Sequence, residues 1–186
     1  SGSGSSSASA QTVSSTSSSS TSGATLTAQA NTLPAGVTEA PSNTALTQVY
    51  EPGSVFKLVT FSSALQNKVI SPTQTFSVPN SLSIGTYTFH DAEAHGTQAM
   101  SASDILDQSS NIGTIEIAQE LGKTRLADQI QALGFGQSTG INFPDESPGI
   151  VKRNPNTWSA SDIGATPNGQ DDAVTVCVNP VRESVT

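Results

Sequence analysis

The sequence of 186 residues has a single cysteine, Cys177, and only seven Lys and Arg residues against fifteen Asp and Glu. One cysteine excludes an internal disulfide and any cysteine-rich metal site. The formal charge of -8 leaves no basic surface to neutralise phosphates, so we expect no nucleic-acid partner. No apolar run approaches the roughly 20 residues that a membrane-spanning helix needs, and there is no signal-peptide pattern. We therefore expect no membrane contact from this chain itself.

Large apolar residues are almost absent from residues 1–30, where only Val13 and Leu26 stand among Ser, Thr, Ala, Gly and Gln. Such a composition cannot bury a core, so it predicts a disordered tail or linker. About 150 residues remain to fold, enough for one domain. We place this domain at 31–175.

Apolar residues recur at helical spacing in the middle of the chain, and extended patterns are few. A run after Pro52 and Gly53 is too apolar for a surface helix, so it predicts a buried one. The expected helices cover 54–67, 101–108, 111–121 and 124–133, the second with a capping box at Ser101 and Asp104 and the last capped by Thr124. Short extended segments are expected at 75–78, 83–89, 140–144 and 173–178. Helices with few strands indicate a mixed α+β fold.

Ser54 and Lys57 form a Ser-x-x-Lys pattern at the start of the first of these helices. Positions i and i+3 share one helical face, so the Lys57 amine can reach the Ser54 hydroxyl. A lysine within an apolar run loses water, which lowers its pKa toward the range where a neutral amine accepts a proton. The alternative is a serine cap with a lysine that extends to solvent.

Ser109 and Asn111 form a Ser-x-Asn pattern between two expected helices. A hydroxyl and a carboxamide at such a junction can relay a proton and hold an amide, but the triplet taken by itself favours the alternative, ordinary capping of the second helix. The order Ser-x-x-Lys followed by Ser-x-Asn is that of penicillin-binding proteins and serine β-lactamases.

The surrounding sequence resembles one branch of that group, the class B penicillin-binding proteins, which are division and elongation transpeptidases. "TQVYEPGSVFKLVTFSSAL" is similar to their active-site helix, and "SASDILDQSSNIGTIEIAQELG" to their second motif with its helices. "LGFGQSTGINFPDESPG" and "ATPNGQDDAVT" are similar to later segments. The resemblance covers about 44–175 and implies a transpeptidase fold of the kind shared with serine β-lactamases.

The resemblance also implies a role for each site residue. Ser54 attacks the carbonyl of a peptidoglycan stem peptide or of a β-lactam and forms an acyl-enzyme. Lys57 accepts the serine proton, and Ser109 helps to pass it to the leaving amine. Asn111 binds the substrate amide and fixes Lys57. The implied location is the extracytoplasmic face of the bacterial cell membrane, and other cell-wall synthesis proteins are suggested partners.

Two parts of the family pattern are missing from the 186 residues. The third motif, Lys-Ser/Thr-Gly, does not occur, and Lys123-Thr124-Arg125 matches it only in part. Residues 176–186 no longer resemble the family. We therefore expect the helical part of the fold with its central antiparallel sheet largely missing, and impaired activity.

Other functions and sites remain as alternatives. A β-lactamase or β-lactam sensor is one alternative, and a non-catalytic interaction protein is the other. His90, Asp91, Glu93 and His95 include metal-ligand types at close spacing, but the family carries such a loop without metal. We predict no metal and no cofactor.

Overall fold

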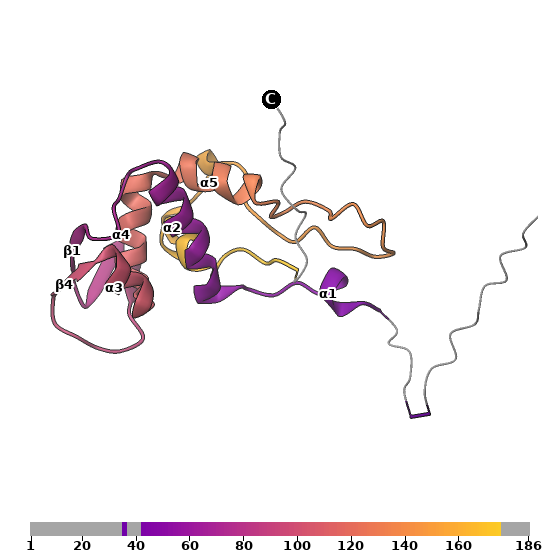
Figure 1. The fold of residues 1–186 in the computed structure, drawn as a ribbon, viewed down its shortest axis with the longest axis horizontal. Helices are drawn as coiled ribbons and strands as arrows, with labels where there is room; N and C mark the ends of the chain where they lie inside the picture. Colours follow the sequence, from indigo (N-terminus) through magenta and orange to yellow (C-terminus); the bar gives the residue numbers. More distant parts are fainter. Residues whose placement is uncertain (1–34, 37–41, 176–186) are drawn as a thin grey trace, which may run out of the picture. The chain divides into compact units, whose positions relative to one another are not determined.

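The computed structural model describes residues 35–36 and 42–175 (Figure 1). Residues 42–175 belong to one compact unit that begins at residue 40. The predicted tail at 1–30 and the segment 176–186 lie outside the described residues, as does Cys177.

Helices dominate this unit, and the strands that the structure describes form two separate two-stranded sheets. The α-helices are α1 (Thr44–Thr47), α2 (Lys57–Gln66), α3 (Ala102–Asp107), α4 (Asn111–Leu121), α5 (Lys123–Ala132) and α6 (Ala160–Ala165). The 3-10 helices are η1 (Gly53–Phe56), η2 (Pro155–Thr157) and η3 (Thr166–Asn168). The strands are β1 (Thr75–Val78), β2 (Ser81–Ile84), β3 (Tyr87–His90) and β4 (Gln98–Ser101). The predicted α+β class is confirmed.

Helix α4 is the centre of the packing, because it contacts α2, α3, α5 and α6. Seven of its eleven residues are buried, including Ile112, Ile115 and Ile117. Burial of one such side chain stabilises the fold by about 1.5–3 kcal/mol. The core has two clusters, and α2 and α4 contribute to both: Phe61, Ala64, Ile112 and Ile117 lie in one, and Phe56, Val59, Ala118 and Leu121 in the other.

One face of α2 has no cover among the described residues. Val55 in η1 is 72% exposed and Leu58 is 57% exposed, and Leu65 lies further along the same side. These positions are separated by three and seven residues, so they form one apolar stripe. Helix α2 is therefore buried on the side toward α4 and open on the other.

The predicted strand at 83–89 is wrong in its extent. Instead, β2 and β3 form an antiparallel hairpin in which Ile84 pairs with Tyr87. Gly85 has a φ of 62°, a conformation suited to the first position of a two-residue hairpin turn. The other sheet pairs β1, which was predicted, with β4, which was not.

Two further local expectations are also wrong, and one helix was not predicted. The range 140–144 is not a strand, because Gly140 and Asn142 have φ values of 82° and 57° that interrupt an extended backbone. Helix α5 has Gly122 rather than Thr124 at its N-cap. Helix α6 was not predicted, although Ser159 and Asp162 form a capping box at its start.

The segment from η3 to Gly169 packs against the start of α2. The Gly53 N–H donates to the Gly169 carbonyl at 2.9 Å, and the Thr60 hydroxyl donates to the Pro167 carbonyl at 3.0 Å. Gly169 has a φ of 71°, and a Cβ there would lie 2.5 Å from both the Gly53 carbonyl oxygen and the Phe56 Cβ. The close approach of these two segments therefore requires glycine.

Gly169→Ala should lower the free energy of unfolding by at least about 1 kcal/mol, because alanine meets both a left-handed backbone and a steric overlap. Urea unfolding measures the effect. Gly96→Ala is the matched control, since a Cβ at Gly96 has nothing within 4 Å. Equal stability of the two variants would contradict this packing.

Candidate active site

Ser54 lies in η1, the first turn before α2. Pro52 precedes this turn with a φ of -68° and Gly53 follows with a φ of 58°. The Ser54 side chain is exposed, and its backbone carbonyl accepts a hydrogen bond from the Lys57 N–H. The predicted helix thus begins one residue earlier than expected, and as a 3-10 turn. Ser54 remains on the turn directly before Lys57.

Lys57, the first residue of α2, is buried and only 1% exposed. Its Nζ donates to the Ser109 hydroxyl at 3.0 Å, to the Asn111 Oδ1 at 2.9 Å and to the Ser109 carbonyl. An ammonium group has three donors, so these three oxygens satisfy it fully. The alternative of a lysine that extends to solvent is excluded.

The junction between α3 and α4 presents these oxygens. Ser109 has a φ of 55°, so the chain reverses there, and Ser110 then caps α4 by accepting the Gly113 N–H at 2.9 Å. Asn111 is fixed at both ends of its carboxamide, because its Nδ2 donates to the His90 carbonyl at 2.9 Å. Ser110 therefore caps α4, while its neighbours Ser109 and Asn111 bind Lys57.

Burial lowers the pKa of Lys57 from 10.5 to about 8, and the negative charge of Asp91 opposes this shift. A pKa near 8 leaves a useful fraction of the amine neutral near pH 7. A neutral amine can accept a proton, which an ammonium cannot.

The structure thus brings together Lys57, Ser109 and Asn111. Ser54 is adjacent on the same helix, but within the described part of the chain its hydroxyl makes no hydrogen bond to Lys57. Their approach rests on the three-residue helical spacing.

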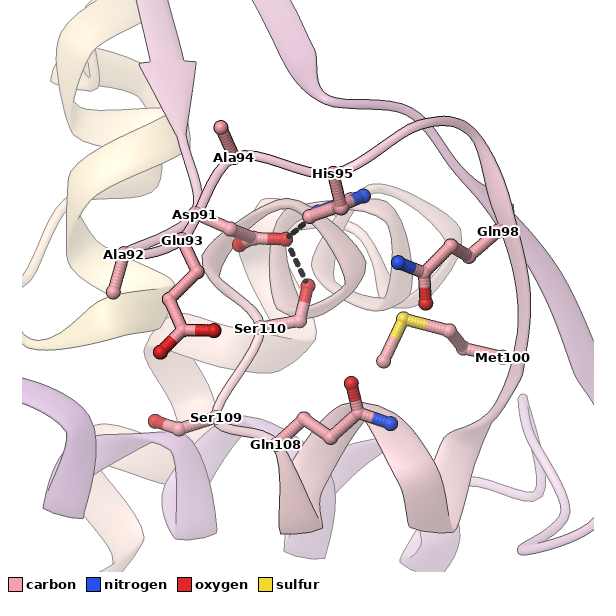
Figure 2. Close-up of a pocket in the computed structure, with 10 residues that line it drawn as sticks. All are labelled: Asp91, Ala92, Glu93, Ala94, His95, Gln98, Met100, Gln108, Ser109 and Ser110. Atoms are coloured by element: carbon pink, nitrogen blue, oxygen red, sulfur yellow. Dashed lines mark hydrogen bonds and ion pairs between the residues drawn. The ribbon is translucent and has the colours of Figure 1, made fainter.

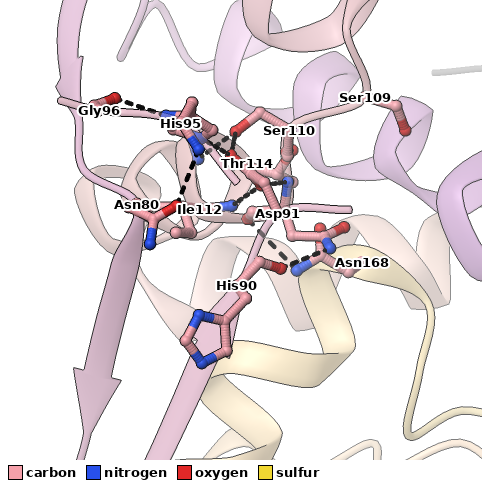
Figure 3. Close-up of polar contacts among 12 residues, drawn as sticks. Asn80, His90, Asp91, His95, Gly96, Ser109, Ser110, Ile112, Thr114 and Asn168 are labelled. Atoms are coloured by element: carbon pink, nitrogen blue, oxygen red, sulfur yellow. Dashed lines mark hydrogen bonds and ion pairs between the residues drawn. The ribbon is translucent and has the colours of Figure 1, made fainter. Parts of the chain in front are cut away.

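Asp91 was not predicted as a site residue, but its carboxylate binds residues of the second motif (Figure 3). Its Oδ1 accepts the N–H groups of Asn111 and Ile112, the latter at 3.0 Å. Its Oδ2 accepts the Ser110 hydroxyl at 2.9 Å and contacts His95 Nε2 at 2.8 Å. Burial works against ionisation, but these hydrogen bonds prevail and lower the pKa of Asp91. The sequence marked Asp91 only as a weak metal-ligand candidate.

A cavity of about 530 Å³ lies beside this group, between the 91–98 loop and the α3–α4 junction. Figure 2 shows Asp91 between His95 and Ser110, with Glu93 and Ser109 along another part of the lining. One side of the second motif therefore borders a polar, accessible cavity.

Among the described residues, no group of three or more His, Cys, Asp or Glu side chains is placed to hold a metal ion. No described helix has the length and apolar character needed to cross a membrane.

A second ionisable cluster surrounds Asp172, which is 1% exposed. One Asp172 oxygen accepts the Lys152 N–H at 3.4 Å, and the other has no partner. The Lys152 amine pairs with Asp162 instead. Burial raises the pKa of Asp172 to about 6, and the charge of Asp171 adds to this effect.

The arrangement around α2 and α4 is that of a penicillin-binding transpeptidase domain. The crystal structure of penicillin-binding protein 3 from Mycobacterium tuberculosis, complexed with aztreonam, superposes with a TM-score of 0.68 and 36% identity. The alignment covers 72% of this chain and 30% of that one.

The chain belongs to the penicillin-binding protein transpeptidase domain family, whose model matches residues 9–181. It is 36% identical over 134 residues to penicillin-binding protein PbpB of Mycobacterium tuberculosis, covering 72% of this chain and 20% of that protein. It is 33% identical over 120 residues to the peptidoglycan D,D-transpeptidase FtsI of Buchnera aphidicola, covering 64% and 20%. The chain thus spans about one fifth of the length of these relatives.

Asp172 should make the fold less stable as pH rises from about 4 to 6. Its folded pKa is raised, so the unfolded chain releases this proton first and stability falls across that window, by up to about 3 kcal/mol. Urea unfolding at several pH values measures the slope. Asp172→Asn should flatten it, and an unchanged slope in this variant would refute the assignment.

Proposed function

We propose that this chain is a penicillin-binding D,D-transpeptidase module that acts through a serine acyl-enzyme, with Ser54 as nucleophile. The observation that carries the proposal is the buried Lys57 amine, held by Ser109 and Asn111 one helical turn from Ser54. Membership of the transpeptidase family supports it.

The acylation step uses the lowered pKa of Lys57. In its neutral form the amine keeps two donors for the Ser109 carbonyl and the Asn111 Oδ1, and its lone pair is free to take the Ser54 proton. Ser54 Oγ then bonds to the substrate carbonyl carbon, and the carbon–nitrogen bond to the leaving amine breaks. The Ser109 hydroxyl, 3.0 Å from Lys57 Nζ, passes the proton to that amine.

The Ser54 N–H is one donor of the oxyanion hole, because it lies at the start of the η1 and α2 helical segment. Asn111 holds the substrate's peptide amide and at the same time fixes Lys57. Both roles suit a carboxamide whose two ends are already oriented by Lys57 and the His90 carbonyl.

The proposed substrate is the stem peptide of peptidoglycan, with β-lactams as its mimics. One relative is named a peptidoglycan D,D-transpeptidase, and a structural relative is complexed with aztreonam. Such a substrate places the module at the extracytoplasmic face of the bacterial membrane, where other cell-wall synthesis proteins are expected partners.

We further propose that the 186-residue polypeptide, tested by itself, acylates slowly. The uncovered Val55 and Leu58 leave one side of the Ser54 turn open to water. The resemblance assigns a second oxyanion donor to a Lys-Ser/Thr-Gly motif, and the loss of one such donor costs about 10²–10³ in rate.

Acylation should be measurable by intact mass spectrometry with a fluorescent penicillin. We expect slow addition of one penicillin per chain, abolished in Ser54→Ala. Ser62→Ala is the matched control, because Ser62 is also an exposed serine and lies in the middle of the same helical segment. Labelling that survives Ser54→Ala, or none in the unchanged chain, would refute the proposal.

The acylation rate should rise with pH through an apparent pKa near 8, because the neutral form of Lys57 is the base. Labelling rates between pH 6 and 10 measure this limb. Lys57→Arg keeps a positive charge but cannot become neutral, so its rate should fall at least about 100-fold, the range for a general base. A pH-independent rate would contradict the assigned role.

The uncovered stripe on α2 favours a second candidate, a non-catalytic interaction protein. Absence of labelling together with a folded circular dichroism spectrum would support it. Sustained nitrocefin turnover would instead indicate a β-lactamase.

A further inference from the structure

We propose that Asp91 and His95 are positioning residues that hold the second motif against Lys57 and set the charge state of its amine. The proposal rests on the proposed role of Lys57 as the base. Neither residue reaches the reacting atoms, so they act through Asn111 and Ser110.

Asp91 is the common partner of three consecutive residues, the last two of the Ser-x-Asn motif and the Ile112 that follows it. It accepts the Ser110 hydroxyl and the N–H groups of Asn111 and Ile112, while the Asn111 side chain contacts Lys57. A carboxylate at the first turn of an eleven-residue helix also interacts favourably with its dipole. Displacement of Asp91 therefore moves the backbone that carries the Lys57 ligand.

His95 holds Asp91 from the other side, and both of its ring nitrogens face oxygen acceptors. Nε2 lies 2.8 Å from the Asp91 carboxylate and Nδ1 lies 2.6 Å from the Gly96 carbonyl. A carbonyl and a carboxylate can only accept, so both contacts are complete only in the imidazolium form. The Gly96 carbonyl, followed by Asp91, raises the pKa of His95.

His95 is also bound to the neighbouring turn, because its backbone N–H donates to Asn80 Oδ1 at 2.9 Å (Figure 3). The contacts therefore form a continuous series from the β1–β2 connection through His95 and Asp91 to Asn111 and Lys57. His90, the other histidine, has its ring turned away from this group (Figure 3).

Other charged side chains influence the pair from each surrounding element. Lys57 approaches from α2, and the Asp91 charge opposes the loss of its proton. Glu116 lies on α4, where burial, Glu120 and Asp91 raise its pKa. Glu93 belongs to the same loop and lines the cavity. Of these, Lys57 is the group of opposite charge, so removal of the Asp91 charge should favour its neutral form.

Asp91→Asn tests the charge with little change of shape, because a carboxamide oxygen still accepts the two N–H groups of α4. We expect Lys57 to titrate at lower pH than in the unchanged chain, measured by ¹³C NMR of its Cε. We expect His95 to lose its stabilised imidazolium, measured by ¹⁵N NMR of the ring. The pH limb of acylation should move to lower pH in parallel.

Asp104→Asn is the matched control. Asp104 also caps a helix, through the Ser101 N–H and hydroxyl, but it caps α3 and makes no contact with Lys57 or Asn111. It should leave both titrations unchanged. Identical Lys57 and His95 titrations in Asp91→Asn and Asp104→Asn would overturn the proposal.

Two further variants test positioning apart from charge. Asp91→Ala removes the whole set of contacts and should slow acylation about 10–100-fold. His95→Gln should weaken acylation below the pKa of His95, whereas His90→Gln should not. Equal behaviour of the two histidine variants would overturn the role of His95. If Asp91→Ala does not fold, Asp91→Asn and the histidine pair still decide the matter.

The experiment separates this inference from the proposed function. A chain that never reacts with penicillin refutes the acyl-transfer function, yet the NMR titrations of Lys57 and His95 still show whether Asp91 controls them. A chain that reacts, with titrations insensitive to Asp91→Asn, refutes the positioning role alone.

Discussion

Lys57 carries its amine into the interior of the helical unit, where the two Ser109 oxygens and Asn111 Oδ1 replace the water it has lost. A buried ammonium without such partners is strongly destabilising, so the α3–α4 junction must lie where it does. The left-handed backbone of Ser109 and the cap formed by Ser110 place the junction there. Packing of α4 on α2 then follows from the same placement.

Two opposing influences decide the charge of that amine. Burial favours the neutral form, and Asp91 favours the charged form. Asp91 is itself kept ionised by the N–H groups of α4, by Ser110 and by His95. The helix that presents Asn111 to Lys57 thus also retains the carboxylate that moderates its pKa, so geometry and electrostatics of the site cannot vary independently.

The helices and the paired motifs were predictable because their signals are local. Apolar spacing placed α2, α4 and α5 correctly to within a few residues. The tetrapeptide Ser-Ala-Ser-Asp occurs at Ser101 and again at Ser159, and both copies form capping boxes, yet only the first precedes an apolar run, which is the signal that predicts a helix. Strand β4 and the Asp91 contacts were missed because pairing with β1 and capping across twenty residues leave no local pattern.

The two sides of α2 differ in what they require. The side toward α4 holds Lys57 and is complete within the described residues, since its partners all come from the α3–α4 junction. The other side carries Val55, Leu58 and Leu65 to the surface, with Val55 next to Ser54. In the proposed mechanism, formation of the base therefore depends only on contacts already present, whereas alignment of a substrate over Ser54 depends on the exposed side. Protonation of Lys57 and the proposed acylation of Ser54 are consequently separable properties of this helical segment.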